Sequence, residues 1–74
     1  MTERRKLSAL QPGERGTVVE ITSGDAQRLM DMGVIRGTAV QVIRVAPLGD
    51  PLEVRVRGFM LTLRRSEAEH ITVE

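Results

Sequence analysis

The stretch LEVRVRGFMLTL, residues 52–63, decides the fold because it reads as two strands joined by a tight turn. Apolar and polar residues alternate through it, which is typical of strands with one face on a core and one in solvent. Arg57-Gly58 can form the two-residue turn between them. Met60, Thr62 and Arg64 fall on the outer face. The predicted inward set is Leu52, Val54, Val56, Phe59, Leu61 and Leu63.

Three further segments have the composition of strands. Residues 16–22 and 38–46 are rich in β-branched residues, and residues 71–73 form a short closing strand. The alternation in residues 38–46 slips near Val42-Ile43, which predicts a bulge or a strong bend. About five short strands with glycine-marked corners predict a mainly β fold, a small antiparallel barrel of the SH3-like type.

A short helix is expected between the first two strands, within SGDAQRLMDMG, residues 23–33. Ser23 is the expected N-cap, and Ala26, Leu29 and Met30 form the apolar stripe that packs on the barrel. Gly33 is the expected left-handed residue that ends the helix. A helix of about two turns is not stable alone in water, so it must pack on the strands.

Length, composition and charge describe a single domain, residues 1–74, with residues 1–6 expected to fray. The chain is 41% hydrophobic and 28% charged, as in soluble globular proteins. Its net charge of +1 predicts no long-range attraction for nucleic acid or an anionic membrane. Because it has no cysteine and no apolar run of membrane-spanning length, we expect a cytoplasmic protein without membrane insertion.

Four pieces of the sequence resemble a known family. L-x-x-L-x-P-G-x-x-G-x-V begins at Leu7, and R-L-M-D-M-G-V-x-x-G-T-x-V begins at Arg28. They are followed by A-P-L-G-D-P-L-E-V-R-V-R-G and by L-x-L-R-R-S-E-A-x-x-I-x-V-E, which ends at Glu74. In this order and at this spacing, the pieces resemble the ferrous iron transport protein A (FeoA) family over residues 7–74.

The resemblance implies an SH3-like barrel that carries a helical insertion. It also implies a cytoplasmic accessory protein of bacterial ferrous iron uptake. The implied partner is FeoB, a membrane transporter whose cytoplasmic part is a GTP-hydrolysing G domain. A partner of this kind would hold the protein at the inner face of the membrane.

The sequence does not assemble a catalytic group. It has one histidine, His70, no phosphate-binding glycine loop, and serines that are explained by caps and turns. Glu67 and His70 form one Glu-x-x-His motif, whereas di-iron sites need two copies and two further glutamates. We therefore expect no enzyme, no cofactor and no built metal site, and binding of a metal at Glu67, Glu69 or His70 stays open.

Two segments exceed what a barrel needs and are the candidate contacts for FeoB. In residues 27–35, apolar residues follow one another too closely for a two-turn helix to bury them all, and exposed methionine adapts well to partners. The loop of residues 47–51 is bracketed by prolines, so it loses little entropy on docking. The predicted partner-binding residues are Arg28, Met32, Val34, Ile35 and Leu48.

These contacts predict a non-catalytic module that docks on the cytoplasmic G-domain region of FeoB to regulate or assemble the transporter. The effect on GTP hydrolysis and the question of self-association stay open. The alternative is an RNA-binding barrel with an arginine-rich sheet face, although RNA-binding barrels stack bases on aromatic residues and this chain has no Trp or Tyr. The arginines of that face are Arg44, Arg55, Arg57, Arg64 and Arg65.

Overall fold

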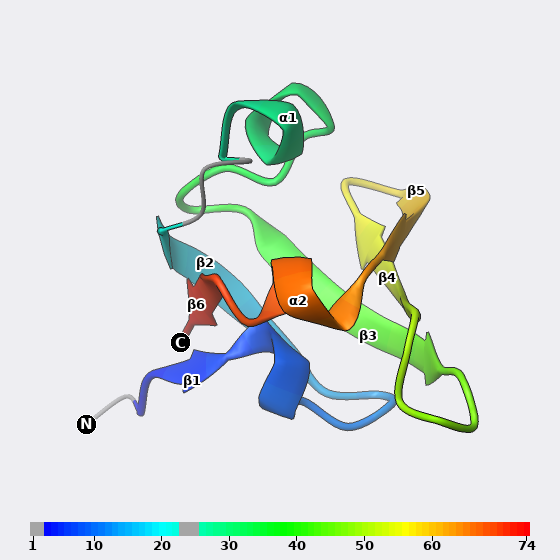
Figure 1. The fold of residues 1–74 in the computed structure, drawn as a ribbon. Helices are drawn as coiled ribbons and strands as arrows, with labels where there is room; N and C mark the ends of the chain where they lie inside the picture. Colours follow the sequence, from blue (N-terminus) through cyan, green and yellow to red (C-terminus); the bar gives the residue numbers. More distant parts are fainter. Residues whose placement is uncertain (1–2, 23–25) are drawn as a thin grey trace.

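The computed structural model describes residues 3–22 and 26–74 (Figure 1). The strands among them are β1 (Arg5–Lys6), β2 (Arg15–Ile21), β3 (Ala39–Val45), β4 (Leu52–Val56), β5 (Phe59–Leu63) and β6 (Ile71–Val73). The helical segments among them are η1 (Leu7–Ala9), α1 (Ala26–Asp31) and α2 (Arg65–Ala68). The mainly β class and the helix between the first two long strands are therefore confirmed.

The strands pair antiparallel in the order β1-β6-β2-β3-β4-β5. β2 pairs with β3 through its first residues and with β6 through its last residues, so it joins the two halves of the sheet. The predicted bend is confirmed by a register shift between Val42 and Arg44. A second shift lies between Val18 and Glu20 in β2. Within the described residues β1 and β5 are the two edges, so hydrogen bonding does not close the sheet into a complete barrel.

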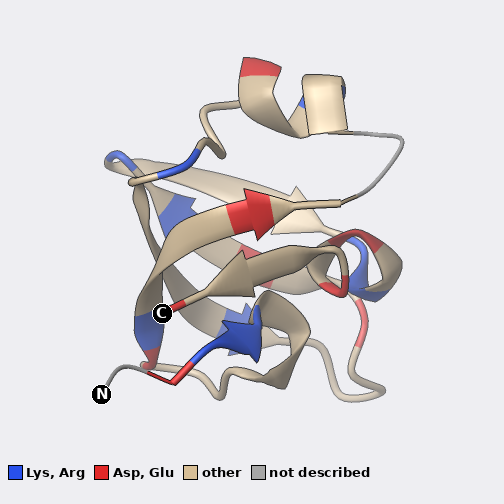
Figure 2. Cartoon of the chain, turned by 90° about the vertical axis from the view of Figure 1, so that its left-hand side faces the viewer, with Lys and Arg blue, Asp and Glu red and all other residues tan. Residues whose placement is uncertain are grey.

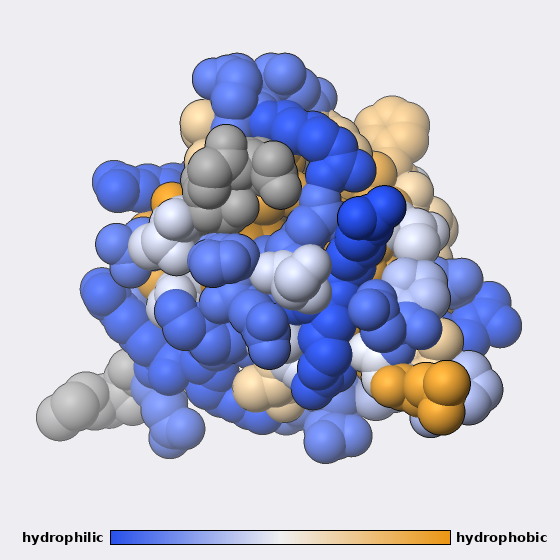
Figure 3. Space-filling model, in the orientation of Figure 1, coloured by the Kyte–Doolittle hydropathy of each residue, from blue (hydrophilic) through white to orange (hydrophobic). Residues whose placement is uncertain are grey.

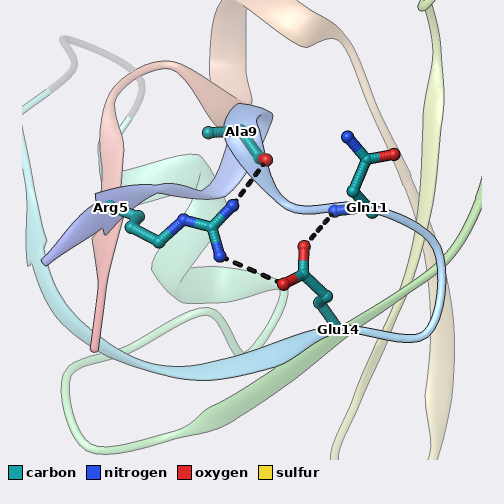
Figure 4. Close-up of polar contacts among 4 residues, drawn as sticks. All are labelled: Arg5, Ala9, Gln11 and Glu14. Carbon is teal, nitrogen blue, oxygen red and sulfur yellow. Dashed lines mark hydrogen bonds and ion pairs between the residues drawn. The ribbon is translucent and has the colours of Figure 1, made fainter. Parts of the chain in front are cut away.

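β1 is a sixth strand, and it corrects the expectation that all of residues 1–6 fray. Its two residues pair with β6. The Arg5 guanidinium also donates hydrogen bonds to the Ala9 carbonyl at 3.0 Å and the Glu14 carboxylate at 3.1 Å (Figure 4). A strand of two residues shows no alternation in the sequence, so only these long-range contacts reveal it.

One core lies inside the curled sheet and receives residues from η1, α1, α2 and strands β2 to β6. The inward set predicted for residues 52–63 is confirmed at Leu52, Val54, Val56 and Leu63, which are fully or almost fully buried. It is wrong at Phe59, which is 73% exposed. That side chain has the inward phase of the strand and is paired with buried Val56, but it follows the hairpin turn on the edge strand β5, where it stays exposed.

Helix α1 buries fewer of its side chains against the strands than the sequence predicted. Leu29 is buried, but Met30 is exposed, so the predicted apolar stripe is wrong at Met30. The helix has only six residues, and the next buried apolar side chain comes from Val34, after its end. Gly33 has φ of 98°, as expected for the left-handed residue that ends the helix. Ser23, the predicted N-cap, lies outside the described residues.

Candidate docking surface

A groove of about 500 Å³ crosses one face of the molecule between α1 and the loop that joins β3 to β4. In Figure 1, α1 lies at the top of this face, the light-green loop at its lower right, and α2 between them. We call it the α1–loop groove, and it is lined by Arg28, Asp50, Pro51, Thr62, Arg64 and Glu67. The groove therefore joins the two segments that the sequence analysis proposed as separate contacts.

Glu67 holds the wall of the groove together. Its carboxylate accepts a hydrogen bond from the Arg64 N–H at 2.9 Å, which caps the start of α2, and forms an ion pair with the Arg28 guanidinium of α1. Burial raises the pKa of the Glu67 carboxyl, but these two hydrogen bonds together outweigh burial and leave that pKa below its ordinary value. The carboxyl is therefore ionised near neutral pH and fixes α1 to α2.

The loop at the other end of the groove is also fixed to α2. The Asp50 carboxylate accepts the Arg65 N–H at 3.0 Å, and the Arg65 guanidinium donates to the Gly49 carbonyl at 3.1 Å. The loop holds Leu48 away from the protein, with 97% of that residue exposed. Figure 3 shows a strongly hydrophobic spot at the position of this loop on an otherwise mainly hydrophilic face. A partner would meet an apolar side chain on a loop that is already ordered.

The five predicted contact residues do not form one exposed cluster. Val34 is fully buried, so its prediction as a partner contact is wrong. Its N–H donates to the Leu29 carbonyl at 3.0 Å, which turns the chain back over the barrel and places the side chain in the core. Met32 packs partly against the same core, and Ile35 is half-buried.

Of the predicted contacts, Arg28 and Leu48 are the well-exposed ones. The Arg28 side chain is 58% exposed although it is paired with Glu67. Both residues lie at the α1–loop groove, one on its wall and one on the loop that forms its far end. Their contact with a partner stays a prediction, which these positions make testable.

The sequence pattern did not indicate that the other lining residues, chiefly Arg64 and Glu67, lie at this surface. Glu67 drew attention only as half of a Glu-x-x-His motif. The useful signal was its spacing from Arg64, because a glutamate at the third helical position commonly caps the N–H that precedes a helix. Within residues 3–22 and 26–74, no group of three or more His, Asp or Glu side chains is placed to hold a metal ion.

The predicted arginine-rich face is divided among separate places. Arg44 forms an ion pair with Glu53 at 3.0 Å. Arg55 and Arg57 line a second hollow, whereas Arg64 lines the α1–loop groove and Arg65 holds the loop. In the view of Figure 2, basic and acidic segments are interspersed along the chain. The five arginines therefore do not gather at a single site.

Comparison with known proteins identifies the family. The family model described as FeoA domain matches residues 5–74. The FeoA protein of Chlorobium tepidum, solved by NMR, is 50% identical with a TM-score of 0.88, over 95% of this chain and 69% of that one. The FeoA of Stenotrophomonas maltophilia, solved with zinc and described as a procaryotic SH3 domain protein, is 31% identical with a TM-score of 0.76, over 92% and 87% of the two chains.

A curated relative links the chain to a transporter. The Fe(2+) transport protein A/Fe(2+) transporter FeoB fusion protein of Porphyromonas gingivalis (strain ATCC BAA-308 / W83) is 32% identical over 71 residues, which are 93% of this chain and 8% of the fusion protein. The chain thus spans less than a tenth of that relative's length. No helix in the described residues is long and apolar enough to cross a bilayer. The match over residues 5–74 shows that the chain belongs to the FeoA family, whose members are linked to ferrous iron transport and have an SH3-like fold.

Proposed function

We propose that the chain is a non-catalytic accessory domain that docks on the cytoplasmic G-domain region of a FeoB-type transporter and regulates or assembles it. The observation that carries this proposal is the fusion protein, in which a segment similar to this chain belongs to the same polypeptide as FeoB. Fusion keeps two domains at high effective concentration, which is useful when their contact is part of their work. The contact itself must be made by a surface of the FeoA-like domain.

The α1–loop groove has the properties of such a surface. Its loop is held by Asp50 and Arg65, so little conformational entropy is lost when Leu48 docks. Arg64 lines the groove without an ion pair among the described residues, so it can receive an acidic side chain of the transporter. Glu67 is held ionised by Arg28 and Arg64, an arrangement that suits binding rather than proton transfer.

The test is binding of the purified protein to detergent-solubilised FeoB, in parallel with the isolated G domain. Each is measured without nucleotide, with GDP and with a non-hydrolysable GTP analogue. We expect binding to both preparations, with an affinity that depends on the nucleotide. Binding to the full transporter but not to the G domain would place the contact elsewhere on FeoB, and binding to neither in any nucleotide state would overturn the proposal.

Leu48→Ser tests the loop at the end of the groove as a contact for FeoB. Because a fully buried leucine contributes about 1.5–3 kcal/mol, we expect the variant to bind FeoB roughly ten- to a hundredfold more weakly. Stability should hardly change, since Leu48 makes almost no contact within the fold. Phe59→Ser is the matched control, because Phe59 is also exposed and apolar but lies at the hairpin end of β5, neither on the loop nor in the lining of the groove. Equal binding by wild type and Leu48→Ser would move the docking surface away from the loop.

A further inference from the structure

A second hollow, of about 180 Å³, opens on the outer face of strands β2, β3 and β4. Arg15, Gln41 and Arg55 are direct cross-strand neighbours in one row, so their side chains share this face. Arg57, in the turn that follows β4, also lines the hollow. We call this place the arginine hollow, and its lining residues are Arg15, Ala39, Val40, Gln41, Arg55, Arg57 and Gly58.

The charge of the arginine hollow is of one sign. None of its lining residues is acidic, and within the described residues Arg15, Arg55 and Arg57 form no ion pair. Four other arginines of the chain are each paired with a glutamate. Three unpaired guanidinium groups around one depression therefore leave a local positive charge that the net charge of +1 conceals.

The depression has a structural cause. Ala39 lies in the row next to Gln41, on the same face, and its small side chain leaves space between the longer side chains of β2 and β4. The strands on either side of β3 are about 10 Å apart, twice the ordinary spacing of strands. Guanidinium groups on long side chains can close over an ion from both sides at that distance. Gln41 is fixed, because its amide Nε2 donates to the Gly13 carbonyl at 3.2 Å.

We propose that the arginine hollow binds a phosphate group. Planar guanidinium groups donate paired hydrogen bonds to phosphate oxygens, and three of them can neutralise a dianion. The group can belong to a small soluble phosphate or to the headgroup of an anionic phospholipid. Exposed Met60, the cross-strand neighbour of Arg55 on the same face, would add apolar contact only with a lipid.

The proposal does not depend on docking to FeoB, and its experiment needs no transporter. In the first arm, inorganic phosphate and then pyrophosphate are titrated into the ¹⁵N-labelled protein at low salt, and amide shifts are followed by NMR. In the second arm, the protein is sedimented with vesicles of phosphatidylcholine alone or mixed with phosphatidylglycerol. We expect saturable shifts centred on Arg15, Gln41 and Arg55 in the first arm, with pyrophosphate binding more tightly than phosphate.

The two arms identify the source of the phosphate group. Sedimentation with the anionic vesicles that is lost in Met60→Ser would assign the hollow to a lipid headgroup. Saturable shifts without sedimentation would assign it to a soluble phosphate. Neither shifts nor sedimentation at low salt would overturn the proposal, and so would binding to single-stranded RNA alone.

Two variants separate a shaped site from diffuse positive charge. Arg55→Gln should weaken phosphate binding about tenfold, whereas Arg44→Gln, with the same change in net charge outside the hollow, should leave it within about twofold. Ala39→Ile fills the hollow without changing the charge and suits an exposed strand position, so it should also weaken binding about tenfold. Equal losses in Arg55→Gln and Arg44→Gln, or full binding by Ala39→Ile, would contradict a built site.

The pH dependence gives an independent readout. Arginine stays protonated at every practical pH, whereas a soluble phosphate monoester gains its second negative charge near pH 6 and a phosphodiester headgroup does not. Binding of such an ester should therefore strengthen as pH rises from about 5 to about 7.5, because the ligand gains charge. An affinity that does not change over that range would show that the hollow does not select the dianion.

Discussion

At the scale of the residue, Glu67 makes the fold sensitive to acid. Its folded-state pKa is lowered from the ordinary 4.5, so its ion pair and cap stabilise the fold above that pH and are lost as pH falls through the folded-state value. Glu67→Gln should cost about 1 kcal/mol at pH 7, since Arg28 is more than half exposed and the pair is partly screened. Urea unfolding at pH 7 and pH 3.5 measures this. The wild type should lose more stability than the variant on acidification, and parallel losses would contradict the role of Glu67.

The positive φ of Arg57 lowers the stability of the fold, because arginine adopts this backbone conformation with difficulty. Both central residues of the β4–β5 hairpin turn have positive φ, 52° at Arg57 and 82° at Gly58, as a type I′ turn requires. Asparagine adopts this conformation more readily than arginine, so Arg57→Asn should stabilise the fold by about 0.5–1 kcal/mol. In a domain of this size that is a rise of roughly 2–8 °C in Tm, measurable by circular dichroism. The same variant should bind phosphate more weakly, and a variant with unchanged Tm would show that the turn is unstrained.

At the scale of the element, β2 and β6 approach each other closely at Gly16. A Cβ there would lie 2.9 Å from Val73 Cβ and Cγ2 and 3.1 Å from the Glu74 carbonyl oxygen. Gly16→Ala should therefore force the strands apart and cost about 1–3 kcal/mol of unfolding free energy, as overpacking does. Thr17→Ala, at the next and exposed position of the strand, is the control and should change stability much less. A stable Gly16→Ala would mean that β6 shifts without cost.

The elements that the sequence predicted well are those that a local pattern defines. Alternation located β4 and β5, and the slip at Val42-Ile43 located the bend in β3. The errors came where burial depends on which element lies opposite. Val34 was expected to be exposed because the helix alone could not cover it, but the barrel covers it after the chain turns at Gly33. Phe59 has the phase of a core residue but lies at the hairpin end of an edge strand, where it stays exposed.

At the scale of the whole molecule, the overall composition does not reveal the two surfaces that suggest binding, the arginine hollow and the α1–loop groove. A net charge of +1 predicted no long-range attraction for nucleic acid or an anionic membrane. It does not show that four arginines are paired with glutamates, whereas the three of the arginine hollow are unpaired within the described residues. The α1–loop groove was equally hidden, because Arg28, Asp50 and Glu67 are far apart in the sequence. Which arginines form ion pairs, and which distant residues lie side by side, depends on the tertiary structure and is not visible in a single sequence.

The two surfaces should act independently, because the α1–loop groove and the arginine hollow have no lining residue in common among the described residues. Sites without shared contacts usually couple by less than about 0.5 kcal/mol, which is roughly a factor of two in affinity. We therefore expect Leu48→Ser to leave phosphate affinity within twofold of wild type, and Arg55→Gln to leave binding to detergent-solubilised FeoB within the same limit. Calorimetry with each ligand measures both. A loss of FeoB binding of tenfold or more in Arg55→Gln would mean that the transporter covers the hollow as well, so that its guanidinium groups meet acidic side chains of the partner instead of phosphate.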